Sequence, residues 1–501
     1  MFMTFLANLQ AVQTDYYVSP AGSHSGTYDN WATAATNIQT AVDVAPSGST
    51  IWIGDGRYTA PGETAVVNLP SKKSLTLHGN SLAPEQVVLD GQGARRGLYV
   101  SFGASNLSLE LNGLTFTNCY RSYHGGGISI ERADSSYSGH TIAVLNCKFS
   151  HNRIGGGSYS GGAISINDWG NSPRTFDTLF SNCVFSANIA TNGGAVHVRN
   201  KNTTIVDCRA VGNSAANKSG GGAFWFYQNE SVVLRGCTFF SNRCDNAGGG
   251  GAVLTYQAPC VLIDCHFEAN ETTRGEVGAS LGGLGGAVYA RENLFVTNCV
   301  FRNNRVDPDW SHGGAIYVAN NVLQTSIYNS LFVGNLANTL TNSHTHAIYG
   351  SNTSIGDFKI VNSTIVSNSG GVGVMGNNTA PNVEIRNCII RHNNLRPIGT
   401  SANYHLDGNG IRQIYNTATY PMPTALFDGG GNSTEDPKFV SLADGDFHLQ
   451  RGSPCIDAGL NQDWMIGATD LDGRPRIDRF SQTVDMGCYE YQKLGSVLIF
   501  R

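Results

Sequence analysis

The residues best suited to chemistry recur at one fixed place in a repeated motif. That motif is Gly-Gly-Ala followed by a short strand, as in Gly193-Gly194-Ala195-Val196. In each strand the residue after Ala and the one two further on are apolar, so the residues between them should point away from the core. The first outward column reads Ser129, Ser165, His197, Trp225, Leu254, Tyr289, Tyr317 and Tyr349. The second outward column reads Glu131, Asn167, Arg199, Tyr227, Tyr256, Arg291, Ala319 and Ser351.

These outward columns have an unusual composition for a solvent-facing strand surface, on which Thr, Ser, Lys and Asn are expected. Aromatic rings suit stacking on sugar rings, and arginine side chains suit carboxylates or sulfates. We therefore predict a ligand groove on this face. The predicted substrate-binding residues are Trp225, Tyr256, Tyr289 and Tyr317 in the strands, with Lys201 and Glu230 in the turns that follow.

Eliminative cleavage of a uronic-acid polymer would use such a set. A base removes the proton beside the carboxylate, a cation stabilises the resulting negative charge, and an acid assists the leaving oxygen. We predict His197 or Tyr227 as the base and Arg199 and Arg291 as the cations, with another tyrosine as the acid.

Other interpretations of the same face stay open. Aromatic residues form strands well, and stacked rings stabilise a sheet without any ligand. A lone histidine such as His197 most often has a surface or packing role. Hydrolysis needs two carboxylates roughly 5–10 Å apart, and the candidates Asp168, Glu230 and Glu292 lie in turns and form no evident pair. The alternatives are thus a glycoside hydrolase and a non-catalytic adhesin or structural repeat protein.

A second motif, Asn-Cys-x-Phe-x-x-Asn, precedes most Gly-Gly-Ala motifs and predicts how the strands stack. Clear copies begin at Asn146, Asn182, Asp264 and Asn298, and looser copies at Asn112, Asp207, Gly236, Asn329, Asn362 and Asn387. Repeats of this length indicate a stacked solenoid, in which equivalent positions form columns.

Three of these columns are predicted to be structural. The cysteine column should be a ladder of reduced, buried thiols, because turns about 4.8 Å apart hold Cβ atoms too far apart for an unstrained disulfide. Its members are Cys147, Cys183, Cys208, Cys237, Cys265, Cys299 and Cys388, with Gly113, Ser330 and Ser363 elsewhere. The phenylalanines should stack inside, and the last asparagine of each copy, from Asn118 to Asn393, should form a hydrogen-bonded ladder at a turn.

Composition excludes several classes of protein. The 501 residues carry a net charge of −5 and no basic run, so nucleic acid is not an expected partner. No apolar stretch approaches the ~20 residues that span a membrane. The segment Met1 to Leu9 could be the remnant of a secretory signal, although it lacks a basic start.

We predict four segments along the chain. Residues 1–15 are the possible signal remnant, 16–111 the N-terminal cap and first turns, 112–394 the repeats, and 395–501 the C-terminal turns and cap. Apolar spacing between Asn30 and Ala45 predicts an amphipathic helix that covers the open end of the strand stack.

The paired motifs resemble those of chlamydial polymorphic membrane proteins and related bacterial repeat proteins. The stretches Gly452 to Gly459, Asp472 to Arg476 and Val484 to Tyr491 resemble the tail of secreted bacterial proteins called choice-of-anchor Q. The resemblance implies an all-β fold, a single-stranded right-handed parallel β-helix (solenoid) of the pectate-lyase-like superfamily, with an N-terminal helical cap and an irregular C-terminal cap. It also implies a secreted or cell-surface location.

Details of the tail depart from that resemblance or add to it. Cys455 and Cys488 stand where the related tails usually have alanine, which suggests that the two could pair, and Cys244 with Cys260 is a weaker candidate pair. We expect no cofactor. The acidic cluster with which many pectate lyases hold calcium is not visible on the outward face, and Asp470-x-Asp472-Gly473 fits an Asx turn better than a calcium site. We expect a monomer that acts on an acidic polysaccharide or another glycan.

Overall fold

A computed structural model describes most of the chain, in two compact units. The described residues are 14–157, 159–168, 175–216, 220–245, 248–273, 284–307, 312–319, 322–337, 346–351, 356–374, 382–393, 403–406, 410–424 and 427–492. The first unit comprises residues 1–215 and 224–231, and the second comprises residues 216–223 and 232–501. The possible signal segment Met1 to Leu9 lies outside the described residues, and the four predicted segments stay a prediction.

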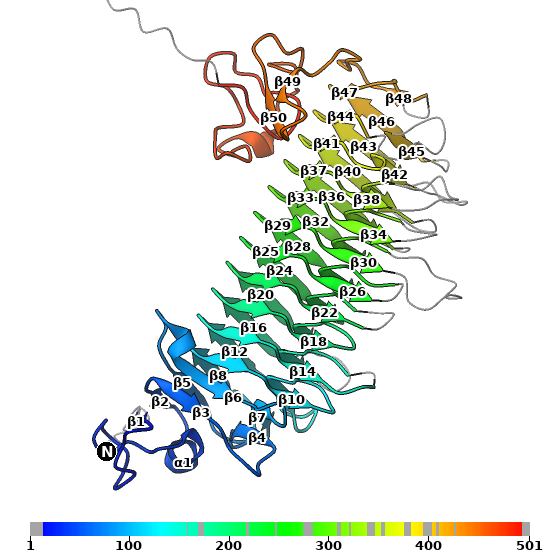
Figure 1. The fold of residues 1–501 in the computed structure, drawn as a ribbon. Coiled ribbons are helices and arrows are strands. Elements are labelled where there is room, and N and C mark those ends of the chain that lie inside the picture. Colours follow the sequence, from blue (N-terminus) through cyan, green and yellow to red (C-terminus); the bar gives the residue numbers. More distant parts are fainter. Residues whose placement is uncertain are drawn as a thin grey trace, which may run out of the picture. The chain divides into compact units, whose positions relative to one another are not determined.

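Each unit is built from short strands that wind through parallel sheets, which we number 1 to 4 in the order in which the chain visits them (Figure 1). In the first unit, sheet 1 contains β1 (Asp15–Val18), β2 (Ser49–Ile53), β5 (Leu75–His78), β8 (Ser108–Asn112), β12 (His140–Leu145), β16 (Phe176–Ser181) and β20 (Asn202–Val206). Sheet 2 contains β3 (Gly56–Tyr58), β6 (Val87–Asp90), β9 (Thr115–Thr117), β13 (Lys148–Ser150), β17 (Val184–Ser186) and β21 (Arg209–Val211). Sheet 3 contains β10 (Tyr120–Arg121), β14 (Arg153–Ile154), β18 (Ile189–Ala190) and β22 (Ser214–Ala215). Sheet 4 contains β4 (Ala65–Asn68), β7 (Arg96–Phe102), β11 (Ile128–Arg132), β15 (Ile164–Asn167), β19 (Val196–Arg199) and β23 (Phe224–Tyr227).

The second unit repeats this plan. Its sheet 1 contains β24 (Ser231–Arg235), β28 (Cys260–Ile263), β32 (Leu294–Thr297), β36 (Gln324–Tyr328), β40 (Asp357–Val361), β43 (Asn382–Arg386), β46 (Arg412–Tyr415) and β48 (Phe427–Asp428). Its sheet 2 contains β25 (Thr238–Phe240), β29 (His266–Glu268), β33 (Val300–Arg302), β37 (Leu331–Val333), β41 (Thr364–Val366), β44 (Ile389–Arg391) and β47 (Ala418–Thr419). Its sheet 3 contains β26 (Arg243–Asp245), β30 (Glu271–Thr273), β34 (Arg305–Asp307) and β38 (Leu336–Ala337). Its sheet 4 contains β27 (Val253–Tyr256), β31 (Val288–Arg291), β35 (Ile316–Val318), β39 (Ile348–Gly350), β42 (Val372–Val374) and β45 (Tyr404–Leu406).

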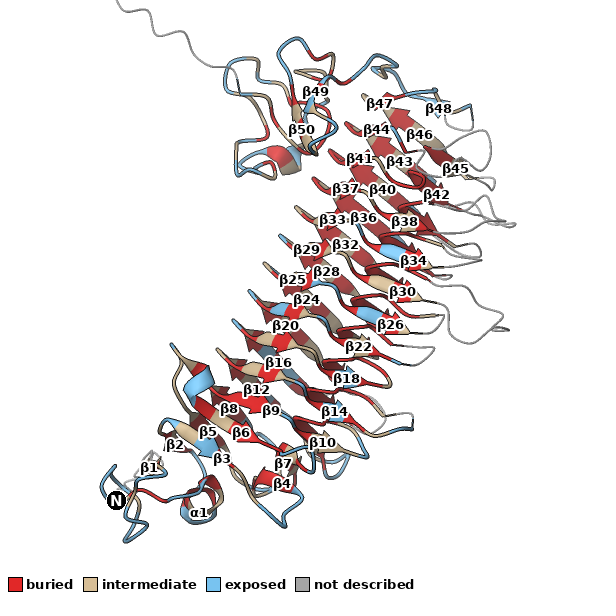
Figure 2. Ribbon diagram, viewed as in Figure 1, coloured by how far each residue is buried: buried red, intermediate tan, exposed pale blue. Residues whose placement is uncertain are grey.

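The Asn-Cys-x-Phe-x-x-Asn motif makes the two bends on either side of sheet 2. Its first residue is left-handed, as in Asn182 (φ 51°), and so is the residue before its last asparagine, as in Ala187 (φ 53°). All the cysteines of the predicted ladder are buried free thiols, which confirms that prediction. The phenyl rings stack inside, with Phe267 and Phe301 at 4.8 Å between centroids. In the asparagine ladder, the buried Asn270 donates from Nδ2 to the Oδ1 of Asn304 at 2.9 Å. Buried segments recur along the stacked strands (Figure 2).

The register of the earliest repeat copy differs from the prediction by one residue. Strand pairing aligns Phe116 with Phe149, which places Leu114, and not Gly113, opposite Cys147. Cys119, and not Asn118, therefore begins the asparagine ladder, because its backbone N–H donates to the Oδ1 of Asn152 at 3.1 Å. Gly113 instead takes the left-handed position at the bend (φ 67°) that Asn146 takes in the next copy.

The two positions of Gly-Gly-Ala require glycine for different physical reasons. The first is left-handed in several copies, as at Gly161 (φ 75°) and Gly313 (φ 69°), where a residue with a side chain would be strained. At the second, an added Cβ would lie 2.3 Å from the carbonyl oxygen of Gly194 at Gly162, and 2.0 Å from that of Gly314 at Gly286. This close approach lets sheet 3 turn into sheet 4 without a gap.

The predicted N-terminal helix is shorter than the sequence suggested. Helix α1 covers only Ile38–Val44, with Asn37 as its N-cap, and its buried residues are Ile38, Ala41 and Val42. Ahead of it the backbone N–H and C=O of Ala35 pair with Tyr17 and Ser19 beside β1. The prediction of a helix from Asn30 was wrong because this pairing removes the preceding residues from any helix. The 3-10 turn η1 (Pro84–Gln86) lies further along the first unit.

The C-terminal tail is irregular and packs on the side of sheet 2 in the second unit. It contains the antiparallel pair β49 (Phe439–Ser441) and β50 (Asp446–Leu449) and the turn η2 (Asp463–Met465). Residues of the tail and outward residues of the sheet share one core. The sheet contributes Leu331, Val333, Val366, Ile389 and Ala418, and the tail contributes Phe439, Phe447, Leu449, Cys455, Met486 and Cys488.

Cysteine pairing in the tail and beyond differs from the candidates suggested by the sequence. Cys455 and Cys488 are both free and buried in this core. Cys244 and Cys260, outside this core, are also free and buried. Neither candidate disulfide is therefore formed. The expected Asx turn is present, since Asp470 Oδ1 accepts the backbone N–H groups of Asp472 and Arg474 at 2.9 and 2.8 Å.

Candidate functional site

Sheet 4 presents the columns that the Gly-Gly-Ala strands predicted. Ile164, Val196 and Phe224 are 0–1% exposed and face the core. Between these core positions, strand pairing aligns Ser165 with His197 and His197 with Trp225. The predicted alternation within these strands is therefore confirmed.

The first outward column nevertheless does not form an open face. His197 is only 4% exposed, Tyr289 is 7% exposed and Tyr317 is 8% exposed. In that column Trp225 is half-buried, whereas in the second outward column Arg199, Tyr227 and Tyr256 are half-buried and Arg291 is exposed. The expectation that the first column faces solvent was wrong, because strand alternation decides only which side chains leave the core and not what covers them.

Four predicted residues come together in the first unit, and we call them patch 1: His197, Arg199, Trp225 and Tyr227. The His197 and Trp225 rings lie 4.6 Å apart between centroids, and the Trp225 and Tyr227 rings 5.3 Å apart. The guanidinium carbon of Arg199 lies 5.5 Å from the centre of the Tyr227 ring. Patch 1 thus joins one cation, one phenol and one indole on neighbouring strands β19 and β23.

The histidine of patch 1 is held by residues that the sequence did not single out. His197 Nδ1 lies 3.4 Å from Ser165 Oγ, and Asn167 Nδ2 donates to the same oxygen at 2.8 Å. Burial lowers the pKa of His197 well below its usual value, with further contributions from His124 and Arg199. His197 is therefore neutral at neutral pH. Alternation within β15 could have pointed to Ser165 and Asn167, since both occupy the outward columns.

The predicted residues of the second unit are Tyr256, Tyr289, Arg291 and Tyr317, which we call patch 2. The Arg291 guanidinium carbon lies 4.4 Å from the centre of the Tyr256 ring and 5.9 Å from that of Tyr289. The Tyr289 and Tyr317 rings meet edge to face at 5.1 Å. Burial raises the pKa of Tyr289 to about 12, and it also raises that of Tyr317. Both phenols are therefore protonated at neutral pH and are hydrogen-bond donors, not bases.

Lys201 and Glu230 lie past the bend that leads from sheet 4 to sheet 1, where the Glu230 N–H donates to the Lys201 carbonyl oxygen at 2.9 Å. The buried amides of Asn200 and Asn229 form this bend, with Asn200 Nδ2 donating to Thr178 Oγ1 at 2.7 Å. Both residues therefore follow the bend and do not lie on the strands that carry patch 1. Among the predicted residues, these two are the ones that the fold does not place in either patch.

Asp168, one of the carboxylates considered for hydrolysis, is already bound within the protein. Asp168 is fully buried and forms an ion pair with the buried Arg132 at 2.8 Å. It also accepts the backbone N–H of Thr175 at 2.5 Å. A carboxylate engaged in this way is a structural group. Among the described residues, no group of three or more His, Cys, Asp and Glu side chains is placed to hold a metal ion.

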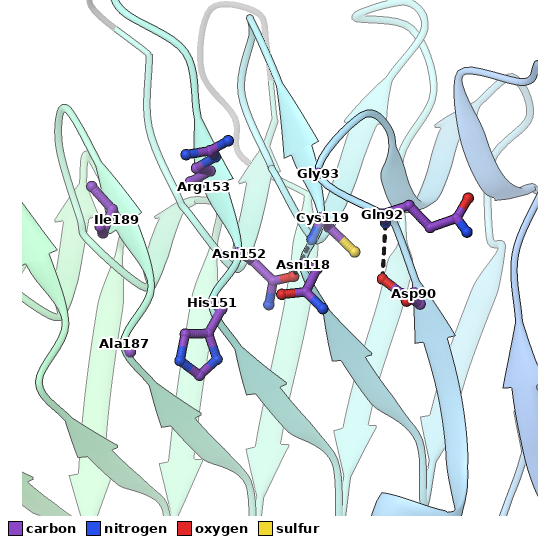
Figure 3. A pocket seen from close by; sticks show the side chains of 10 residues that line it. All are labelled: Asp90, Gln92, Gly93, Asn118, Cys119, His151, Asn152, Arg153, Ala187 and Ile189. Atoms are coloured by element: carbon purple, nitrogen blue, oxygen red, sulfur yellow. Dashed lines mark hydrogen bonds between the residues drawn. The ribbon is translucent and has the colours of Figure 1, made fainter. Parts of the chain in front are cut away.

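A groove of about 550 Å³ opens at the bend between sheets 2 and 3 of the first unit (Figure 3). It is lined by Asp90, Gln92, Gly93, Asn118, Cys119, His151, Asn152, Arg153, Ala187 and Ile189. Its acidic group is already engaged, because Asp90 pairs with Arg57 at 2.5 Å. Burial raises the pKa of Cys119 to about 12, so this thiol is not a nucleophile at neutral pH. The groove therefore offers polar contacts but no reactive pair.

Comparisons with known proteins found a family model and solved structures that are similar to this chain. The family model described as "Right handed beta helix region" matches residues 138–337. The crystal structure of pectate lyase Pel9A is similar, with 15% identity, a TM-score of 0.41, and coverage of 96% of this chain and 97% of that one. The alginate lyase AlyGC of family PL6 is more distant, with 11% identity, a TM-score of 0.27, and coverage of 78% of this chain and 73% of that one.

No curated protein matches the chain. Within the described residues, no helix has the length and hydropathy of a membrane span. The family-model match and the sheet order agree on one fold class. The chain is a right-handed parallel β-helix, as the sequence predicted.

Proposed function

We propose that this protein binds an acidic polysaccharide outside the cell and cleaves it by elimination at patch 1. The observation that carries the proposal is the contact of Arg199 with Tyr227 beside the half-buried indole of Trp225. A guanidinium matches a carboxylate, and an indole face suits a sugar ring. These are the groups that recognition of a uronate requires.

Tyr227 takes the proton-transfer role in this proposal. His197 is a poor base, because it is 4% exposed and burial lowers its pKa. Tyr227 is half-buried and lies against the cation that would neutralise the carboxylate. The base removes the proton on the carbon beside the carboxylate, and the electron pair of that C–H bond forms the new double bond as the bond to the glycosidic oxygen breaks. Another tyrosine, acting as the acid, gives a proton to the leaving oxygen.

Patch 2 is proposed as a second contact for an acidic glycan. Arg291 is exposed, and its guanidinium lies over the Tyr256 ring in a cation–π contact. The guanidinium can therefore bind a carboxylate while the ring holds it in place. The protonated Tyr289 and Tyr317 supply donors. The adhesin alternative keeps both patches as binding surfaces without turnover. The hydrolase alternative is weakened by the ion pair that occupies Asp168.

The test is ultraviolet absorbance of the full chain with a panel of acidic polysaccharides, because elimination creates a conjugated double bond. We expect a rising signal on one polymer, reduced at least 100-fold, in the range seen when a transition-state donor is removed, by Arg199→Gln or Tyr227→Phe. Arg209→Gln is the matched control, since it removes an exposed arginine from β21 in sheet 2. A flat trace with no new reducing ends would contradict the lyase proposal and favour the adhesin.

A further inference from the structure

The hydrogen bonds around two histidines determine which ring nitrogen carries the proton. Ser160 donates its backbone N–H to Nδ1 of His124 at 3.1 Å. A backbone N–H can only donate, so Nδ1 of His124 must be unprotonated. Burial lowers the pKa of His124, with Arg96 contributing. Its single proton at neutral pH is therefore on Nε2.

At His197 a related arrangement involves two side chains. Asn167 donates its amide N–H to Ser165 Oγ at 2.8 Å, which uses that oxygen as an acceptor. The hydroxyl proton of Ser165 is then available to Nδ1 of His197, 3.4 Å away. Donation of this hydroxyl proton to Nδ1 puts the single proton of the neutral His197 on Nε2, the arrangement that we adopt for this ring. The His124 and His197 rings stack at 6.1 Å between centroids, so the two imidazoles are neighbours.

Patch 1 and the adjoining strand β15 also hold hydrogen-bond donors and one hydrogen-bond acceptor that a ligand could use. The indole Nε1 of Trp225 is buried and has no hydrogen-bond partner in the protein, and neither has the Oδ1 of the fully buried Asn167. Buried polar atoms without partners are rare and call for an occupant. The indole and the guanidinium of Arg199 can only donate, while the Asn167 oxygen can only accept.

We propose that His124 and His197 are neutral Nε2–H hydrogen-bond donors rather than bases, and that with Trp225 and Arg199 they bind the carboxylate of a hexuronate. Asn167 and Ser165 are positioning residues, and the Asn167 oxygen accepts a hydroxyl of the same sugar. The identity of the ligand rests on the proposed function, whereas the protonation of the rings does not.

The protonation is tested by long-range ¹H–¹⁵N correlation spectra of the full chain labelled at histidine, with His124→Gln and His197→Gln to assign the signals. We expect the Nε2–H pattern for both rings at neutral pH. Ser165→Ala should convert His197 to a mixture of tautomers. Ser129→Ala is the matched control, because Ser129 is an equally buried serine one turn earlier that donates to Glu131 and not to a histidine. An Nδ1–H pattern or a charged ring at His197 would overturn the proposal.

The ligand is tested by titration with D-galacturonate against D-galactose in the same spectra. We expect the uronate alone to shift the Nε2–H signals and the indole N–H signal of Trp225, with affinity about fivefold lower in Ser165→Ala, the effect of one hydrogen bond. Shifts with both sugars, or with neither, would overturn the carboxylate assignment. Absence of polymer cleavage with the uronate shifts intact would instead contradict only the proposed elimination.

Discussion

Single residues in this protein are buried for different reasons, and the thiols show this most clearly. Burial raises the pKa of Cys147, Cys260 and Cys388 to about 12, so none ionises near neutral pH. In the ladder the thiol donates locally, as Cys299 does to the carbonyl oxygen of Thr297 at 3.2 Å. The cysteine thus behaves as a small apolar residue with a weak donor, which explains why serine replaces it at Ser330 and Ser363.

The state of the thiols yields a direct prediction. The native chain should not react with an alkylating reagent at neutral pH, because all 12 cysteines are buried free thiols. After unfolding in denaturant without reductant, mass spectrometry should find every one of the 12 alkylated. Finding Cys455 and Cys488 protected until a reductant is added would show that a disulfide links them after all.

Individual strands compensate for one another across the core. The stack of phenyl rings in sheet 2 runs from Phe149 to Phe185 at 5.1 Å and is interrupted at Ala210, which pairs with Phe185. A residue from the opposite sheet takes the place of the missing ring, since Phe224 of β23 meets Phe185 edge to face at 5.3 Å. The large residues of β23 and the small one of β21 therefore belong together.

A double-mutant cycle tests this compensation. Phe224→Ala should lower the free energy of unfolding by about 3–5 kcal/mol, the usual cost of removing a buried ring. Ala210→Phe should also destabilise, because a second ring does not fit beside Phe224. The double variant should recover part of both losses in chemical denaturation. Strictly additive effects would contradict the proposed sharing of space.

At the scale of the whole chain, the outward face of sheet 2 changes character along the second unit, and the tail is the reason. Leu331, Val333 and Val366 point out of the coil yet are buried under the tail. Asparagines at the bends hold the tail. Asn387 Nδ2 donates to the Leu460 carbonyl oxygen at 2.9 Å, and Asn387 Oδ1 accepts the Leu460 backbone N–H at 2.8 Å. The motifs that resemble choice-of-anchor Q tails thus form a laterally attached layer.

A buried charged cluster lies inside this layer. Arg476 is fully buried, and its guanidinium lies 3.0 Å from the carboxyl group of Glu490 and donates to the Gly487 carbonyl oxygen. Burial raises the pKa of Asp485 to about 6 and that of Glu490 to about 9, while Arg476 acts in the opposite direction on both. Outside this core, His448 is held between Asp446 and Asp472 and its pKa is raised by those contacts against its partial burial.

These shifts predict that the tail loosens as pH rises. A group whose pKa is higher in the folded state stabilises the fold fully below its unfolded value, and that contribution is lost as pH rises through the folded value. Asp485 and Glu490 should thus weaken tail packing progressively between about pH 5 and pH 9. His448 acts in the same direction.

Hydrogen-exchange protection of residues 455–491, corrected for intrinsic rates, measures the effect in the full chain. Protection should fall across this range, and Glu490→Gln should flatten its dependence on pH because the glutamine side chain does not titrate. Glu435→Gln, at an exposed position, should keep the dependence of the parent chain. Protection that increases with pH would contradict the assignment.

The sequence by itself determined the features that depend on the turn-by-turn repeat. Stacked phenylalanines, the asparagine ladder and the buried thiols could be predicted, because in a stacked coil each position meets its own equivalent one turn away. The alternation in sheet 4 was predictable for the same reason. The register of the earliest copy, at Gly113 and Asn118, could not be predicted. A shift of one residue there leaves a sequence that still resembles the motif.

Only the tertiary structure decided what covers each face. Alternation directed His197 and Tyr317 away from the core but could not show that both are buried. Nor could it show that Ser165 and Asn167 would hold His197. Residues Leu331 and Cys488 lie far apart in the chain and share one core, which local spacing does not encode. Burial and protonation in this protein depend on these long-range contacts, whereas the coil itself follows from a pattern repeated locally.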